Sequence, residues 1–374
     1  MSEYQYYDFI AMDRDLTEKE RGYVESVSTR ANVSGRRWRN EYNYGDFRGS
    51  VDKMMQIYDA HVYVSNFGSY YFMLRLPDDL MPLGELVHYE DGAVFSVRSV
   101  GKSLVLRWDV ESEGEDGWVE GEGVLDGLIG VRDELLQGDT RPLYLGWLAG
   151  LHDDEAEDDD KNVAPPVPAG MGNLTSAQQA FAEFLRVDRD FIAAAASVSG
   201  AASDVDGDLE GVLSSMEPVE MRELLLRVAH GEGGKVAAEL KRRGKAQAKP
   251  TDKALSCHDL RQLAEKERVR RLARAAEEKE KKRREKEKRR QAHLQEVLNQ
   301  TDSYWEKADT AASLGKSSSY EEASRLLHDL AAAYDSAGKK QEFNRRYVMF
   351  TKQHASRKAL LRRLTDLCKW QNTD

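Results

Sequence analysis

The architecture follows from RRLARAAEEKEKKRREKEKRRQ, residues Arg270 to Gln291, which predict one long, charged, solvent-facing helix. Glu, Lys and Arg are strong helix formers without branching at Cβ. Glutamates precede basic residues by four positions, the favourable orientation for ion pairs along a helix. These pairs are Glu277–Lys281, Glu278–Lys282, Glu280–Arg284 and Glu285–Arg289. Ser256 and Asp259 have the spacing of a capping box, and no Gly or Pro interrupts residues 251–314. We therefore expect a helix over 250–314.

Apolar residues on this helix are confined to its two ends. They are Leu260, Leu263, Val269, Leu272, Ala273 and Ala276 near the start and Leu294, Val297 and Leu298 near the end. A coiled coil requires apolar heptads that are sustained over three or four repeats, and the middle has none. We expect a single charged helix that acts as a spacer. A coiled-coil arm and a nucleic-acid-binding arm are the alternatives.

Charge is distributed unevenly along the 374 residues, whose net charge is −11. Residues 241–290 hold 21 Lys and Arg against 9 Asp and Glu, a local net charge of +12. The remaining 324 residues hold 34 against 57, which gives −23. A basic arm on an acidic body can bind nucleic acid, or it can bind acidic protein, including the acidic segments of this chain.

Cysteine content and hydropathy exclude several classes of protein. Cys257 and Cys368 are too few for a disulfide framework or a Cys-rich zinc site. The N-terminal MSEYQYYDFIAMDRD lacks the basic start and apolar core of a signal peptide. No run approaches the roughly 18 apolar residues of a membrane span. We expect a soluble, cytoplasmic protein without membrane contact.

Residues 1–151 have the pattern of an α+β domain with a mostly antiparallel sheet. Aromatic and alternating apolar residues predict strands at 4–11 and 36–44. Turn residues between apolar runs predict hairpins over 61–76 and 93–110. Thr17 and Glu20 form a capping box, which predicts a helix that extends to about Ser28.

The rest of the chain is expected to be helical. The run HDDEAEDDDKNVAPPVPAGMG, acidic and then proline-rich, predicts an extended linker over 152–173. Short helices follow over 174–249, one capped by Thr175 and one starting at Pro218 with an apolar face formed by Val219, Leu224, Leu225 and Val228. After the long helix at 250–314, a helical hairpin is expected over 319–367. The fold class is an α+β domain followed by an all-α region.

The sequence predicts no catalytic set, cofactor site or metal site. Gly101-Lys102-Ser103 and Gly315-Lys316-Ser317 lack the upstream Gly of a P-loop. Cys257-His258-Asp259 are adjacent residues on a helix and point about 100° apart, so they cannot act together as a triad. His61, near Asp59, is the most enzyme-like position, as a general base at a turn. The alternative interpretation is a strand histidine beside a hairpin.

Two groups of residues could contact nucleic acid. Residues 36–44, RRWRNEYNY, interleave bases with aromatics on a predicted strand, which suits phosphate contact and base stacking. The alternative is a core aromatic face with exposed arginines. The candidates are Arg37, Trp38 and Arg39 on the strand and Arg270, Arg271, Arg274, Lys281, Lys282, Arg283 and Arg284 on the helix, within residues 261–291. Interspersed glutamates weaken the helix as a phosphate-binding arm.

Two resemblances to known families are present. YQYYDFIAMDRDLT (4–17), NEYNYGDFRG (40–49), YDAHVYVSNFGSYYFMLRLP (58–77) and RPLYLGWLAG (141–150) resemble a widespread family of uncharacterised bacterial proteins. That resemblance runs over most of the chain and implies no activity. Residues 319–364 are similar to the tail of bacterial SWIM zinc-finger proteins. Their Cys-x-Cys and Cys-x-His zinc ligands are absent here, so no metal-binding or DNA-binding residue transfers, and the resemblance implies at most a docking module.

These observations favour a non-enzymatic, cytoplasmic interaction or scaffold protein, with two binding modules separated by a charged helical spacer. A protein partner is expected. The first alternative is a nucleic-acid-associated accessory factor that uses the basic helix. The second is an enzyme with a site near His61.

Overall fold

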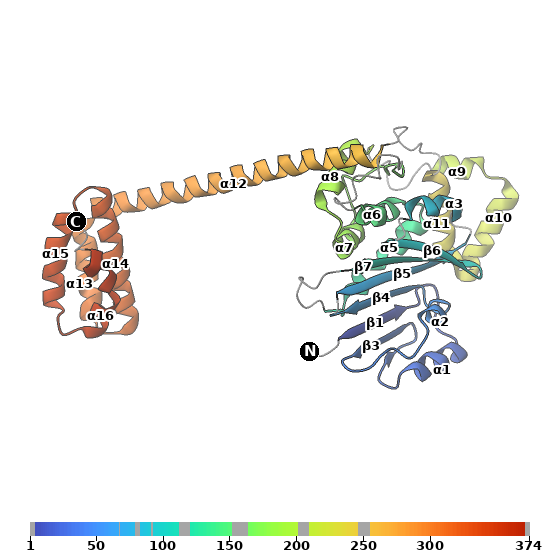
Figure 1. Ribbon diagram of the computed structural model, residues 1–374, viewed down its shortest axis with the longest axis horizontal. Coiled ribbons are helices and arrows are strands. Elements are labelled where there is room, and N and C mark those ends of the chain that lie inside the picture. Colours follow the sequence, from blue (N-terminus) through green and yellow to red (C-terminus); the bar gives the residue numbers. More distant parts are fainter. Residues whose placement is uncertain are drawn as a thin grey trace. The chain divides into compact units, whose positions relative to one another are not determined.

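The computed structural model describes residues 4–66, 68–78, 83–90, 93–111, 120–151, 164–200, 209–245 and 255–370 (Figure 1). The chain forms two compact units, Met1–Arg270 and Arg271–Asp374, and each is described by itself. The predicted fold class is confirmed: an α+β region with an antiparallel sheet precedes an all-α region with a long charged helix and a helical hairpin.

A seven-stranded sheet forms the centre of the first unit, and all its described strand pairs are antiparallel. The spatial order is β2-β3-β1-β4-β5-β7-β6. The strands are β1 (Gln5–Ile10), β2 (Asn32–Val33), β3 (Arg37–Tyr42), β4 (Ala60–Ser65), β5 (Ser69–Pro77), β6 (Phe95–Val100) and β7 (Ser103–Glu111). Both predicted hairpins are present, as β4–β5 and β6–β7. Gly101 lies in the tight turn between β6 and β7 at a φ of +64°, so its Gly-Lys-Ser is a hairpin turn rather than a phosphate-binding loop.

The two faces of the sheet belong to different apolar clusters because side chains alternate along each strand. On β5, Phe72 and Leu74 join the larger cluster, whereas Met73 joins the smaller one. The smaller cluster packs beneath α1 (Glu18–Val27) and α2 (Val51–Met55). The predicted capping box of α1 is present, with Thr17 and Glu20 bonded to each other's backbone N–H.

Helices cover the other face of the sheet (Figure 1). They are α3 (Leu83–Leu86), the 3₁₀ turn η1 (Val87–Tyr89), α4 (Val124–Leu128), α5 (Gly130–Leu136), α6 (Arg141–Ala149), α7 (Ser176–Phe184) and α8 (Arg189–Val198). Phe181 of α7 lies against Trp108 of β7, with ring centroids 5.1 Å apart. Helices α7 and α8 therefore share a core with the sheet.

Part of the predicted linker is not an extended linker. Residues 152–163 lie outside the described residues, but Ala164, Val167 and Met171 are buried in the larger cluster. The N–H of Ala164 donates to the carbonyl of Leu255 at 3.1 Å. Composition suggested a solvated segment, but the few apolar residues among its prolines fill the core instead.

A helical hairpin follows in the first unit. It comprises α9 (Leu209–Ser215), α10 (Pro218–Arg227), the π-helical turn η3 (Val228–Glu232) and α11 (Gly233–Lys245). Pro218 opens α10 as predicted. Gly231 lies in the π-helical turn, and Gly233 and Gly234 open α11, so the chain stays helical through this glycine-rich stretch.

The long helix is shorter than predicted. Helix α12 spans Cys257–Asn299, and a separate α13 (Thr301–Ser313) follows it. Gln300 leaves helical geometry at φ −116° and ψ 29°, and the Thr301 hydroxyl donates to the carbonyl of Leu298 at 2.6 Å. Such local side-chain bonds compete with the helix, which explains an end without Gly or Pro. The predicted capping of the start is present, since Ser256 and Asp259 bond reciprocally.

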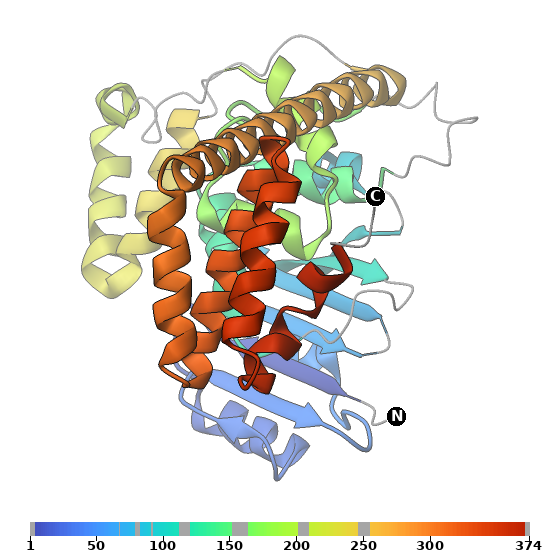
Figure 2. The same cartoon turned by 90° about the vertical axis from the view of Figure 1, so that its left-hand side faces the viewer.

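The second unit is a helical bundle at the end of α12 (Figure 2, orange to red). Its helices are α13, α14 (Ser317–Ser336), α15 (Lys340–Gln353), α16 (Lys358–Arg363) and α17 (Thr365–Trp370). Its core combines Leu294 and Val297 of α12 with Trp305, Leu327 and Phe343. Among the residues that the structure describes, no helix is both long and apolar enough to cross a membrane.

Candidate functional site

The charged part of α12 is exposed to solvent over its whole circumference. Every residue from 281 to 290 is exposed. Of the four predicted ion pairs, one forms: Arg284 Nε lies 3.0 Å from Glu280, which also binds Arg283 at 2.9 Å. Arg284 and then Arg283 lower the pKa of the Glu280 carboxyl. The pairs predicted for Glu277, Glu278 and Glu285 are not among the ion pairs of the described residues.

The predicted cations on α12 do not all behave alike. Arg270 binds Glu267 at 2.7 Å, within the helix. Arg274, Lys281 and Lys282 make no ion pair within the described part of the chain. The remaining predicted cation, Arg271, has an electrostatic or hydrogen-bonding partner. The helix therefore carries both self-paired and available positive charges.

Cations lie all round the helix axis, but one side of α12 carries cations only. Successive residues of an α-helix are rotated by about 100°. This rotation puts Lys279, Lys282, Arg283, Lys286, Arg289 and Arg290 on one side of α12, with no acidic residue between them on that side. We call these six residues the basic stripe. Only Glu277 lies opposite the stripe. Glu278 and Glu285 flank its edge at Arg289, and Glu280 and Glu287 flank its edge at Arg283, where Glu280 bonds that arginine.

The candidates on β3 are buried or bound to acidic groups. Trp38 is fully buried, and its indole N–H donates to the carbonyl of Val24 at 3.0 Å, so its ring cannot stack on a base. Arg37 is held by the carboxylates of Asp8 at 2.6 Å and Asp126 at 2.7 Å. The guanidinium of Arg39 lies 3.8 Å from Glu122. The aromatic side of this strand is core, and its arginines bind acidic groups of the same unit.

His61 is a core histidine rather than a general base. It is fully buried, its ring is stacked on Phe9 with centroids 3.6 Å apart, and its Nδ1–H donates to the carbonyl of Asp8 at 2.9 Å. Burial lowers the pKa of its imidazole to about 3. Asp59, its expected partner, instead accepts from Arg75 at 2.6 Å. The other ring nitrogen, Nε2, lies 3.5 Å from the hydroxyl of Tyr71, so both nitrogens face groups of the core.

Cys257, His258 and Asp259 start α12, and their positions follow from that role. Cys257 is buried in the core of the first unit, whereas Asp259 caps the helix through Ser256. Within the described ranges, no cluster of three or more His, Cys, Asp and Glu is arranged to hold a metal ion.

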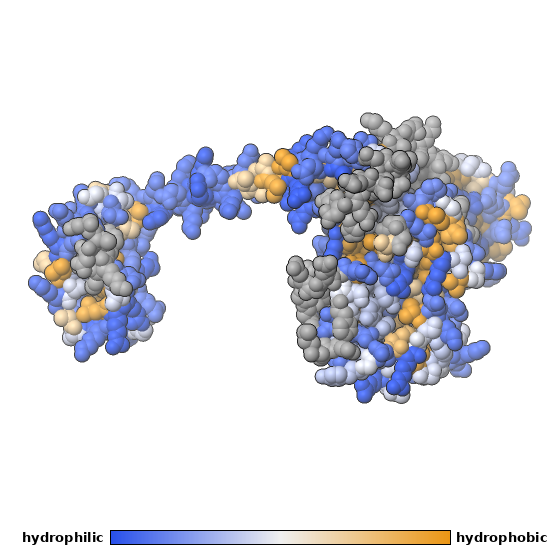
Figure 3. All heavy atoms as spheres, in the orientation of Figure 1, coloured by the Kyte–Doolittle hydropathy of each residue, from blue (hydrophilic) through white to orange (hydrophobic). Residues whose placement is uncertain are grey.

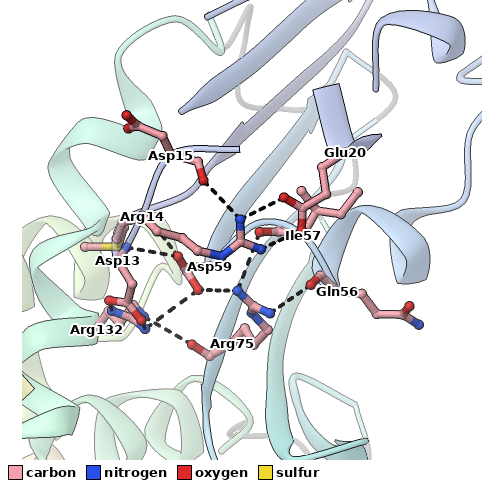
Figure 4. A network of polar contacts seen from close by, with 10 residues as sticks. Asp13, Arg14, Asp15, Glu20, Gln56, Ile57, Asp59, Arg75 and Arg132 are labelled. Atoms are coloured by element: carbon pink, nitrogen blue, oxygen red, sulfur yellow. Dashed lines mark hydrogen bonds and ion pairs between the residues drawn. The ribbon is translucent and has the colours of Figure 1, made fainter. Parts of the chain in front are cut away.

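A buried polar network at one end of the sheet was not predicted (Figure 4). Asp59 is its centre: it accepts from the N–H of Met12 at 2.7 Å and from Arg75 at 2.6 Å, and it lies 3.8 Å from Arg132. Arg132 binds both oxygens of Asp13, at 3.0 and 2.9 Å. The network joins the β1–α1 loop, the residue just before β4, strand β5 and helix α5. Its charges satisfy one another, so its role is structural.

The outward half of α9 and α10 carries an unusual number of exposed apolar side chains (Figure 3). Val219 is 79% exposed and Leu225 is 64% exposed, whereas Val212 of α9 and Leu224 of α10 are buried. We call this surface the α10 apolar face; it consists of Leu213, Val219, Met221, Leu225, Leu226 and Val228. The sequence predicted an apolar face here, but nothing in the pattern indicated that most of it would meet solvent.

Ion pairs hold the inner side of α10 against α11. Arg227 binds Glu239 at 2.8 Å, and Arg243 binds both Glu220 at 2.5 Å and Glu239 at 2.7 Å. Burial works to raise the pKa of Glu239, but the two arginines outweigh it, and the net shift is downward. The inner side of α10 is thus fixed by polar contacts, which leaves its apolar residues outside.

Comparison with known proteins gives no relative to reason from: no protein-family model matches the chain, and neither a curated protein nor a solved structure matches it significantly. The two family resemblances in the sequence remain predictions.

Proposed function

We propose that this protein is a non-enzymatic, cytoplasmic interaction protein that binds a protein partner through the α10 apolar face. Its second unit is a further binding module, and α12 is the spacer that connects the two. The observation that carries the proposal is the exposure of six large apolar side chains within residues 213–228. A contiguous exposed apolar patch on a protein surface commonly marks an interaction site.

The rim of this face indicates the chemistry of the partner. Glu210, Glu217 and Glu223 are exposed around the apolar residues, and Arg222 is the exposed cation among them. A stable interface has an apolar centre and a polar rim of complementary charge. The fitting partner is a protein surface with an apolar centre and a mainly basic rim.

The experiment compares three baits, each the full chain, in affinity capture from the native host. The wild type is compared with L225K/L226K, which places charge at the centre of the face, and with L314K. Leu314 is 62% exposed in the second unit and serves as the matched control. Lys and Leu have similar helix propensities, and exposed substitutions usually change stability by about 0.5 kcal/mol or less.

We expect a protein that wild type and L314K retain and that L225K/L226K loses. Purified, that protein should bind L225K/L226K at least tenfold more weakly than it binds wild type. Equal recovery by all three baits would contradict the proposal. So would a change of the chain's own oligomeric state in L225K/L226K, because the face would then be occupied by a second copy.

A further inference from the structure

The charged part of α12 has an excess of positive charge, and this excess is not spread evenly around the helix. Residues 277–290 contain nine Lys and Arg and five Glu. Because α12 is one continuous helix, the six cations of the basic stripe recur at intervals of three or four residues along one side. At about 1.5 Å per residue, Lys279 to Arg290 extend the stripe over roughly 16 Å.

The stripe is available for binding. Apart from Arg283, which is bonded to Glu280, its members make no ion pair within the residues that the structure describes. The net charge of the second unit also favours binding of an anion, because residues 271–374 hold 24 Lys and Arg against 16 Asp and Glu. Residues 1–270 hold 31 against 50, so the positive charge is a property of the second unit.

We propose that the basic stripe binds the phosphate backbone of duplex DNA without reading its sequence. This activity is separate from the protein binding proposed above, and either can fail without the other. Cations that replace condensed counterions supply most of such non-specific affinity. Duplex DNA carries one charge per about 1.7 Å of axis with both strands counted, so a 16 Å length of duplex offers roughly nine phosphate charges to six cations.

The composition of the helix favours a duplex over a single strand. Proteins that bind single strands without sequence preference stack bases on aromatic side chains. Helix α12 contains no Phe, Tyr or Trp, and Trp38 is buried in the other unit. The contacts on offer are therefore charges alone, which suit a continuous double-stranded backbone.

The same composition argues against an acidic protein as the ligand. Protein interfaces have an apolar centre from which charged residues are depleted. Between Lys279 and Arg290, the stripe side of α12 carries only cations. A purely charged surface lacks the apolar area that gives a protein complex its affinity, whereas it matches a polyanion.

The test compares two triple variants that remove equal charge from one helix. K279Q/K282Q/K286Q removes half of the stripe. R274Q/K281Q/K288Q removes three cations from the other side of α12, where Glu277, Glu278 and Glu285 are neighbours. Gln has nearly the helix propensity of Lys and Arg, and circular dichroism verifies that both variants keep their helicity. Fluorescence anisotropy with a labelled mixed-sequence duplex is measured for the full chain at several KCl concentrations.

We expect wild type and R274Q/K281Q/K288Q to bind the duplex similarly and K279Q/K282Q/K286Q to bind at least tenfold more weakly. Loss of three phosphate contacts should make the negative slope of log K against log salt shallower by about 2.7. Equal weakening in both variants would overturn the proposal, because binding would then follow net charge. Absence of binding by wild type at low salt would also overturn it.

Three further ligands decide the class of polyanion. They are the matching single strand, a duplex RNA of the same sequence and poly-Glu, each measured with wild type and both variants. Tighter binding of the single strand or of the RNA would overturn the assignment to duplex DNA. Tighter binding of poly-Glu, with the same loss in K279Q/K282Q/K286Q, would make the stripe a docking surface for acidic protein instead.

Discussion

His61 lies on the face of the sheet that carries the smaller apolar cluster. Its ring is stacked on those of Phe9 and Tyr7, with ring centroids 3.6 Å and 6.0 Å away. Its Nδ1–H donates to the carbonyl of Asp8, which fixes the neutral tautomer. An imidazole in this position fills volume and satisfies a backbone acceptor. Protonation would put an unpaired charge into the core, so the folded state resists it.

This burial makes stability depend on pH. The pKa of His61 is lowered to about 3 in the folded state from an ordinary value near 6.5, so below 6.5 the unfolded chain binds a proton that the folded chain does not. The contribution of the neutral His61 ring to the free energy of unfolding is fully present above pH 6.5. It is lost as the pH falls toward 3, at about 1.4 kcal/mol per pH unit. Urea unfolding should show that slope between pH 6 and 5.

The matched variants are H61Q and H88Q. Gln at 61 can still donate to Asp8 but does not titrate, so H61Q should lose about 1.4 kcal/mol per pH unit of slope in that range. His88 is exposed, and H88Q should keep the dependence of the wild type. Identical slopes in the wild type and H61Q would show that His61 is protonated in the folded state.

At the scale of elements, Asp59 joins parts of the chain that no local pattern relates. Its carboxylate is 2% exposed and binds Arg75 of β5, the backbone of the β1–α1 loop and, at longer range, Arg132 of α5. Arg132 is itself buried, so the charges compensate one another away from water. Removing one partner of such a pair is more costly than the pair is stabilising.

We therefore expect D59N to lower the free energy of unfolding by about 3 kcal/mol, since Arg75 would keep its charge without a carboxylate. The measurement is urea denaturation at neutral pH. D15N is the matched control: Asp15 pairs with Arg36, both side chains are more than half exposed, and the expected loss is below about 1 kcal/mol. Equal losses in D59N and D15N would show that the network does not stabilise the sheet.

Elements defined by short-range signals were predictable, and their surroundings were not. The capping boxes at Thr17 and Thr175 and the β4–β5 and β6–β7 hairpins occur as expected, because a cap or a turn is determined by a few neighbouring residues. The burial of Met171 and the exposure of Leu225 were missed. Both depend on which distant element lies opposite, and periodicity reports only that an apolar face exists.

Part of the candidate site could likewise have been identified from the sequence. The basic stripe could have been found there, by placing Lys279, Lys282 and Lys286 on a helical projection instead of counting charges along the chain. Trp38 could not have been excluded as a base-stacking residue from the sequence. A strand with alternating arginines and aromatics has the same sequence pattern whether its aromatic side is buried or exposed. The sheet topology, with β3 beside β1 and beneath α1, decided that question.

At the scale of the whole molecule, the cores of the two units share no residue. Leu260 and Ala264 of α12 belong to the core of the first unit, and Leu294 and Val297 belong to that of the second. No residue between 265 and 293 is a member of any apolar cluster of the described chain. A stretch of some 29 residues that is held by helix propensity and charge pairs alone transmits little cooperativity.

We therefore expect the units to unfold in two transitions, each sensitive only to its own core. Phe343 and Phe72 are both fully buried, one in each unit, and replacing a buried Phe by Ala usually costs about 3–5 kcal/mol. F343A should move one calorimetric transition to lower temperature and leave the other in place, and F72A should do the reverse. A single transition, or a joint shift in either variant, would show that α12 couples the two cores. The protein would then respond as one body to a ligand on either unit, rather than as two modules that bind independently.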